Sequence, residues 1–180
     1  MTGRDSTKIL VVDDEAAIRE VLSASLRDDG YDVQVAEEGV KALQFIESGQ
    51  PQIVLLDIWM PGEIDGLEVL QRSKKSQPNS EFIVMSGHGT IETAVKAVKL
   101  GAWDFVEKPL SMDKVSILIE NILNYQREKR EKQSLLNKLR KDIALIGESE
   151  EMKRLKSLIA RVAPTESWVL IGGESGTGKE

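Results

Sequence analysis

Residues 8–15 read KILVVDDE, a short β-rich apolar run that ends on adjacent acidic residues. Four similar runs follow it: YDVQVA at 31–36, QIVLLD at 52–57, EFIVMS at 81–86 and AWDFVE at 102–107. The segments between the runs carry apolar residues at helical spacing, such as Ile18, Val21 and Leu22. Strands that alternate with helices predict an α/β fold, a doubly wound, five-stranded parallel sheet with helices on both faces.

The residues that follow these runs are expected to gather at one edge of the sheet, because the carboxyl ends of parallel strands meet there. They are Asp13, Asp14, Asp57, Ser86 and Lys108. Three carboxylates close together repel one another unless a cation neutralises them, and an all-oxygen site suits Mg²⁺. Each acidic residue alone could simply cap a helix or a turn. Together with the lysine and the hydroxyl, they predict a site where a carboxylate oxygen attacks a phosphorus atom.

Three longer stretches carry the pattern of a known family. They are ILVVDDE, IVLLDIWMPGEIDGLEVL and FIVMSGHGTIETAVKAVKLGAWDFVEKPL. They resemble the receiver domains of bacterial response regulators over residues 8–125, so we expect a flavodoxin-like receiver domain at residues 1–125. The resemblance implies that Asp57 is the phosphoacceptor and that a phosphohistidine on a partner sensor histidine kinase is the donor.

The same resemblance implies roles for the other residues of the site. Asp13, Asp14 and the phosphoacceptor itself would bind Mg²⁺, together with the backbone carbonyl of Trp59. Ser86 and Lys108 would contact the phosphoryl group. These roles remain expectations, since a resemblance transfers a pattern and not a geometry.

Two further features belong to this comparison. Phe105 corresponds to a switch aromatic, whose ring turns inward when the hydroxyl of Ser86 is drawn toward the phosphoryl group, although a plain core phenylalanine would give the same pattern. The loop after the phosphoacceptor, DIWMPGEIDG, has one more residue between Pro61 and Asp65 than family members usually have. We therefore expect a slightly longer loop beside the site.

The sequence changes character after Pro109. An apolar seam recurs at spacings of three and four through Val115, Leu118, Ile122, Tyr125, Leu136, Leu139, Ile143 and Ile146. The seam predicts a long helix, which Lys129 and Lys132 interrupt. Residues 126–145 are therefore either a solvated helical linker whose first turns pack on the sheet, or a coiled coil that pairs two copies. We favour a homodimer through the receiver and the linker helix.

Residues 146–180 carry a different pattern. The stretch SEEMKRLKSLIARVA predicts a helix with Ser149 as its N-cap, and the apolar run SWVLIG predicts a further strand. The glycine-rich GESGTGKE that follows is typical of a phosphate-binding loop, in which backbone N–H groups surround an anion. The candidate nucleotide-binding residues are Gly173, Glu174, Ser175, Gly176, Thr177, Gly178, Lys179 and Glu180, the last in place of the usual Ser or Thr.

This last part resembles the opening of the AAA+ domain of sigma-54-dependent transcription activators, in the nitrogen-regulation (NtrC/NtrX) group of response regulators. The resemblance implies that residues 146–180 are the N-terminal fragment of an AAA+ ATPase domain that ends in its Walker A loop. An incomplete site should bind nucleotide weakly, so we expect ATP binding and ATPase activity only in an intact protein. Contacts with sigma-54 RNA polymerase and DNA would belong to missing domains.

Composition excludes several other classes of protein. The chain has 180 residues, no cysteine, 41% hydrophobic and 30% charged residues. This is typical of a globular protein without disulfides or thiolate metal sites. No apolar run approaches the roughly 20 residues of a membrane span, so we expect a cytoplasmic location and no membrane partner. Residues 1–110 hold 11 Lys and Arg against 19 Asp and Glu, which argues against DNA binding through this part.

The function that the sequence predicts is that of a response regulator in a two-component system. Phosphorylation of Asp57 would regulate a sigma-54-dependent AAA+ activator, and the receiver would catalyse its own Mg²⁺-dependent phosphorylation and dephosphorylation. One alternative is a stand-alone receiver that acts as a phospho-dependent protein-binding module. Another is a haloacid-dehalogenase-type phosphatase, but that class needs an Asp two residues after the nucleophile, where Trp59 stands.

Overall fold

The order of strands and helices is given by a computed structural model, which describes residues 7–87, 90–142, 147–165, 168–170 and 172. The chain divides into two units, Met1–Lys129 and Arg130–Glu180. The first unit holds the sheet and its helices, and the second holds the end of the long helix and one further helix. Each unit is described by itself.

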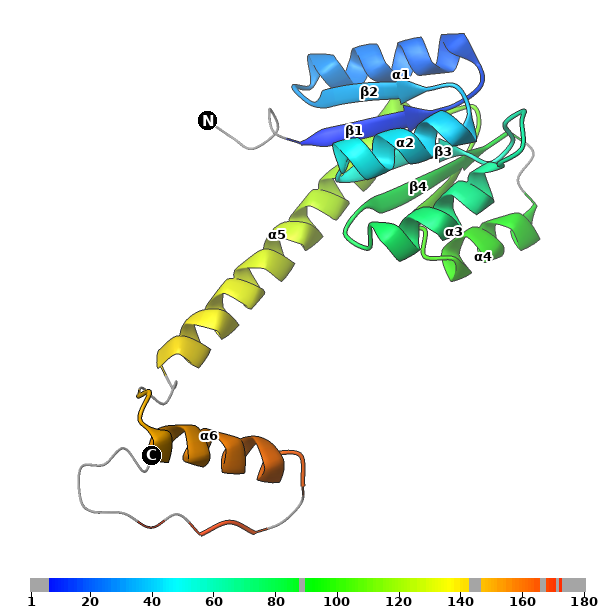
Figure 1. Ribbon diagram of the computed structural model, residues 1–180. Helices are drawn as coiled ribbons and strands as arrows, with labels where there is room; N and C mark the ends of the chain where they lie inside the picture. Colours follow the sequence, from blue (N-terminus) through cyan, green and yellow to red (C-terminus); the bar gives the residue numbers. More distant parts are fainter. Residues whose placement is uncertain (1–6, 88–89, 143–146, 166–167, 171, 173–180) are drawn as a thin grey trace. The chain divides into compact units, whose positions relative to one another are not determined.

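Five parallel strands form the sheet of the first unit (Figure 1). They are β1 (Lys8–Val12), β2 (Asp32–Ala36), β3 (Ile53–Asp57), β4 (Glu81–Ser86) and β5 (Asp104–Glu107). Their order across the sheet is β2-β1-β3-β4-β5, so the chain winds outward in both directions from β1 and β3. The predicted α/β fold and five-stranded parallel sheet are confirmed.

Within the described residues, six helices connect or follow the strands. They are α1 (Ala16–Asp28), α2 (Gly39–Gly49), α3 (Gly66–Ser76), α4 (Ile91–Lys99), α5 (Met112–Asp142) and α6 (Glu150–Val162). Side-chain oxygens of Asp65, Thr90 and Ser149 cap α3, α4 and α6 by accepting from backbone N–H groups in their first turns. The predicted cap at Ser149 is therefore confirmed.

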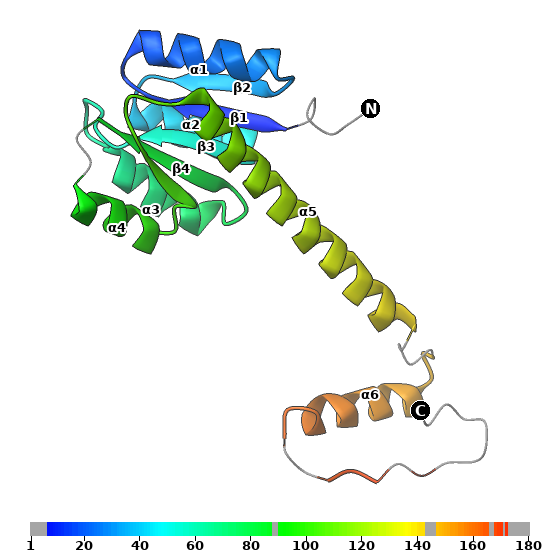
Figure 2. The same cartoon turned by 180° about the vertical axis from the view of Figure 1, so that it is seen from behind.

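Helices α1 to α4 and the start of α5 cover the sheet in two layers, which Figures 1 and 2 show from opposite sides. Successive residues of a strand point to opposite faces, so each strand supplies two cores. In β1, Ile9 and Val11 pack with α1 and the start of α5, whereas Leu10 and Val12 pack with α2, α3 and α4. Burial on both faces explains why the central strands β1, β3 and β4 read as continuous apolar runs.

Helix α5 begins as a core helix. Val115, Leu118, Ile119 and Ile122 are buried against the sheet, which matches the expectation that the first turns of the long helix pack there. Further along, Leu135 and Leu136 are exposed. A solvated helix and a coiled coil both fit this pattern, so the homodimer stays a prediction.

The second unit departs from the sequence expectation at the run SWVLIG. Residues 168–170 have no strand assignment, and the side chains of Trp168 and Leu170 are fully exposed. A strand requires a neighbouring strand for its backbone hydrogen bonds, and the part of this unit that the structure describes holds none. The candidate nucleotide-binding residues Gly173–Glu180 lie outside the described residues. No helix within the described part of the chain is both long enough and apolar enough to cross a membrane.

Candidate functional site

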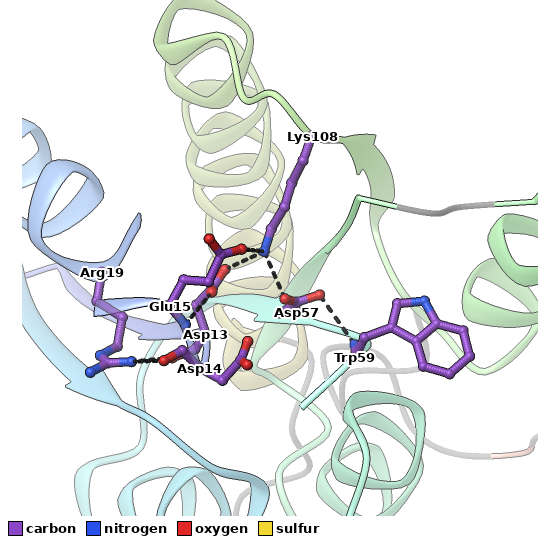
Figure 3. Close-up of polar contacts among 7 residues, drawn as sticks. All are labelled: Asp13, Asp14, Glu15, Arg19, Asp57, Trp59 and Lys108. Atoms are coloured by element: carbon purple, nitrogen blue, oxygen red, sulfur yellow. Dashed lines mark hydrogen bonds and ion pairs between the residues drawn. The ribbon is translucent and has the colours of Figure 1, made fainter. Parts of the chain in front are cut away.

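The carboxyl ends of β1, β3 and β5 bring four candidate residues together, as Figure 3 shows. Asp13 and Asp14 follow β1, Asp57 ends β3, and Lys108 follows β5. The Lys108 ammonium lies between two of the carboxylates, with its Nζ 2.7 Å from Asp57 Oδ2 and 2.8 Å from Asp13 Oδ2. The rim predicted from strand ends therefore exists, and one cation is shared by two acidic side chains.

The three aspartates can supply the ligands of a metal ion. One carboxylate oxygen from each of Asp13, Asp14 and Asp57 lies within 4.8 Å of the others. Asp13 and Asp57 are buried, whereas Asp14 is exposed and opens the cluster to solvent. Mg²⁺ prefers oxygen ligands and keeps several waters, and a divalent cation would balance the charge that three carboxylates and one ammonium leave. The donor set therefore fits Mg²⁺.

Burial and neighbouring charges shift the pKa values of two groups in the site, Asp13 and Lys108. Loss of solvent raises the pKa of Asp13 above its ordinary value, although Lys108 and the Glu15 backbone N–H oppose this effect. Burial by itself lowers the pKa of Lys108, but its hydrogen bonds and charge interactions with Asp13 and Asp57 outweigh burial and raise that pKa above its ordinary value. Lys108 is therefore a cation at neutral pH.

An Asp13→Asn variant is expected to be more stable than the unmutated protein in the absence of metal at pH 7. The pKa of Asp13 in the folded protein is above its unfolded value. Protonated Asp13 therefore contributes stability at low pH, and this stability is lost as pH rises through the folded-state pKa. Asparagine keeps the oxygen that accepts from Glu15 N and removes the charge. Urea unfolding should show a higher midpoint for the variant at pH 7, and the difference should shrink as pH falls.

The exposed neighbour Asp14 provides the control for this experiment, since Asp14→Asn removes a carboxylate that solvent already stabilises. An Asp13→Asn midpoint equal to or below that of the unmutated protein at pH 7 would contradict the argument from burial.

The chain matches two known families. A family model described as the response regulator receiver domain matches residues 9–120. The chain belongs to the response regulator receiver family. A second model, described as the sigma-54 interaction domain, matches residues 145–180. The receiver is thus followed by the start of a second domain.

Two relatives match most of the length of this chain. A putative NtrX-like response regulator of Rickettsia conorii is 41% identical over 173 residues, which make up 96% of this chain and 36% of the relative. A crystal structure of NtrX from Brucella abortus in complex with ATP has a TM-score of 0.67 and 41% identity, and the match covers 89% of this chain and 35% of that one. The chain therefore spans about a third of the length of these relatives.

A third relative is matched over the receiver alone. The solution structure of the beryllofluoride-activated NtrC4 receiver domain dimer has a TM-score of 0.62 and 38% identity. The match covers 66% of this chain and 97% of that one.

Of the remaining residues predicted for the receiver, Ser86 and Trp59 lie at the rim and Phe105 lies within β5. Ser86 is buried at the end of β4, and its backbone carbonyl accepts a 2.8 Å hydrogen bond from Lys108 N. Phe105 is half-buried on β5 and packs against the core under α2, α3 and α4. Trp59 N donates to Asp57 Oδ1 at 3.2 Å, while its ring extends away from that carboxylate (Figure 3). Metal binding by the Trp59 carbonyl and switching by Phe105 stay predictions.

The loop between β3 and α3 begins and ends close to the same point. Gly62 has φ +115°, a left-handed conformation that a residue with a side chain rarely adopts. The loop closes at Gly66, whose N–H donates to the Ile58 carbonyl at 3.0 Å. The loop therefore returns to the end of β3 and leaves Asp57 at the rim.

Two residues of the receiver site were missed by sequence reasoning. Glu15 places Oε1 3.6 Å from Lys108 Nζ. Arg19 donates from Nη1 to the backbone carbonyls of Asp13 and Asp14, at 2.7 and 2.8 Å. Their positions, at the N-cap and in the first turn of the helix that follows the acidic pair, are the signal that could have identified them.

Proposed function

We propose that this receiver accepts a phosphoryl group on the Asp57 carboxylate from a phosphohistidine of a sensor histidine kinase. The observation that carries the proposal is the position of Asp57, buried at the end of β3 with its Oδ2 on the Lys108 ammonium and Asp13 and Asp14 beside it. Two-component regulation of a sigma-54-dependent activator agrees with the two matched domains.

The transfer forms one covalent bond and breaks another. An oxygen of Asp57 forms a bond to phosphorus as the bond from phosphorus to the donor imidazole nitrogen breaks, and that nitrogen keeps the electron pair. Lys108 stabilises the negative charge on the phosphoryl oxygens, and Trp59 N holds the other carboxylate oxygen in place. Bound Mg²⁺ would supply further positive charge at Asp13, Asp14 and Asp57, which is how phosphoryl transfer is usually assisted.

The same contacts can convert phosphorylation into a change of packing. A phosphoryl group brings nearly two negative charges to Asp57. The phosphorylated side chain would then compete with Asp13 for the Lys108 ammonium. The Lys108 backbone N–H donates a hydrogen bond to the Ser86 carbonyl, so a movement of Lys108 would affect β4 and β5 together. Phe105 lies on this pair of strands and is the candidate reporter of the change. Phosphorylation shifts the equilibrium only by the extra stability it gives one state.

We propose that the receiver and the linker helix form a homodimer, with α4 contributing to the interface. Ile91, Val95 and Val98 expose apolar side chains on α4, and Ile91 is 84% exposed. The matched NtrC4 receiver domain is described as a dimer, which supports the proposal. Water would be removed from these side chains on pairing.

An Ile91→Glu variant is expected to weaken dimerisation at least about tenfold, because a charge would be placed in an apolar contact. Val21→Glu is the control, since Val21 is 62% exposed on α1 and carries a similar side chain. Sedimentation equilibrium of both variants, with and without a phosphodonor, measures the effect. Equal weakening by both variants would mean that α4 has no special role.

We propose that residues 146–180 belong to an ATPase domain whose Gly173–Glu180 segment contributes to ATP binding in a longer protein. The match to the sigma-54 interaction domain supports this, and one relative was crystallised with ATP. Sigma-54 polymerase and DNA would be contacted by other parts of such a protein. A response regulator of this kind would act in the cytoplasm.

Phosphoryl uptake tests the proposal directly. The chain is incubated with a small acyl phosphate, with and without Mg²⁺, and its intact mass is measured. We expect a gain of one phosphoryl group that depends on Mg²⁺. A protein that binds Mg²⁺ but gains no mass from any small phosphodonor would contradict the proposed chemistry.

A further inference from the structure

A cation from α1 holds the backbone of residues 13–15, which we call the acidic loop. Arg19 is half-buried, and its Nη1 donates to the carbonyl oxygens of both Asp13 and Asp14, at 2.7 and 2.8 Å. Figure 3 shows the guanidinium lying against the acidic loop on the side away from Lys108. One nitrogen therefore ties together two successive peptide groups.

Tying these peptide groups fixes the directions of the two side chains. Asp13 N donates to the Ala36 carbonyl at 3.2 Å, which anchors the beginning of the acidic loop on β2. Glu15 N donates to Asp13 Oδ1 at 3.0 Å, which anchors its end. The peptide between Asp13 and Asp14 lies between these anchors, and Arg19 orients it together with the next peptide. The planes of the two peptide groups on either side of Asp14 set the direction of its Cα–Cβ bond.

Charge gives a second reason for the contact. The carboxylates of Asp13, Asp14 and Asp57 approach within 4.8 Å and repel one another. Lys108 offsets this repulsion by binding carboxylate oxygens, the atoms that a metal ion also needs. The bonds described for Arg19 go to backbone oxygens instead. Arg19 can therefore support the acidic loop in both the free and the metal-bound protein.

We propose that Arg19 is a positioning residue for Mg²⁺ binding, which acts by orienting the Asp13 and Asp14 peptide groups and not by touching the metal or the phosphoryl group. The inference rests on the proposed metal site and adds a supporting residue to it. Residues that orient metal ligands typically change metal affinity about 10- to 100-fold when they are replaced.

Isothermal titration of the full chain with MgCl₂ tests the inference. Arg19→Gln should bind Mg²⁺ about tenfold more weakly. Phosphoryl uptake by this variant should return close to the unmutated rate when Mg²⁺ is saturating. Arg19→Lys keeps a cation near the carbonyls and should lose less affinity, and it keeps the test possible if the glutamine variant does not fold.

Arg27 offers a matched control on the same helix. Its Nη2 donates to the Val33 carbonyl at 2.9 Å and its Nη1 donates to Ser23 Oγ at 3.3 Å. Arg27→Gln therefore also removes one cation and two hydrogen bonds, away from the acidic loop. Thermal unfolding of both glutamine variants measures any general loss of stability. We expect Arg27→Gln to bind Mg²⁺ with unchanged affinity.

The outcomes separate this inference from the proposed function. Unchanged Mg²⁺ affinity in Arg19→Gln, or an equal loss in Arg27→Gln, would overturn the role of Arg19 and leave the phosphoacceptor chemistry intact. An unmutated chain that does not bind Mg²⁺ would overturn the metal site and this inference together. Weakened binding in Arg19→Gln alone, with full uptake at saturating Mg²⁺, supports it.

Discussion

An Asp57→Asn variant is expected to take up phosphoryl groups at least about a thousandfold more slowly than the unmutated chain, which in practice means no gain in mass. The neutral amide is a poor nucleophile, and its replacement also removes one carboxylate of the metal cluster. The amide oxygen can still accept from Trp59 N, so the fold should be kept. Intact mass after incubation with an acyl phosphate and Mg²⁺ measures the effect.

Asp65 is the control for this substitution. It lies in the loop after the same strand, is exposed, and caps α3 by accepting from Glu68 N at 2.8 Å. Asn is about as good an N-cap as Asp, so Asp65→Asn should fold and take up one phosphoryl group as before. Uptake by Asp57→Asn at a normal rate would move the phosphoacceptor to another residue, and Asp14, the exposed member of the cluster, would be examined next.

The fold was predictable because its signals are local. The central strands β1, β3 and β4 are buried on both faces and therefore read as continuous apolar runs. The helical segments between successive strands favour parallel pairing. The rim followed from the same reasoning, since the residue after each strand must lie at the shared edge. The Lys108 contacts to Asp57 and Asp13 required no further information than this.

The remaining features depend on contacts that are distant in the sequence. Arg19 reads as an ordinary surface cation, because its partners are backbone carbonyls that carry no sequence signal. The apolar seam of α5 has the same spacing whether it packs on a sheet or on a second helix. The extent of its burial against the sheet, as far as Ile122, therefore required the structure. The run SWVLIG has strand composition, but pairing partners decide whether such a run becomes a strand.

The close packing of Gly66 against the phosphoacceptor strand predicts a large loss of stability on its replacement. A Cβ atom at Gly66 would overlap the carbonyl oxygen of Asp57 and lie 2.8 Å from Ile58 Cα. Both obstacles are backbone atoms of a fully buried strand end, so no side chain can rotate to make room. Gly66→Ala should therefore lower the free energy of unfolding by about 3 kcal/mol, near the upper end for overpacked sites.

Gly87→Ala is the matched control, because among the described residues a Cβ there meets only the Lys108 side chain, at 3.9 Å. Urea unfolding should show almost no change for this variant. Relief of the overlap at Gly66 requires α3 or the end of β3 to move, and the end of β3 carries Asp57. We therefore expect the folded fraction of Gly66→Ala to take up phosphoryl groups more slowly, even at temperatures where it is fully folded. A variant that loses stability but keeps the normal uptake rate would show that α3 moves and the phosphoacceptor does not.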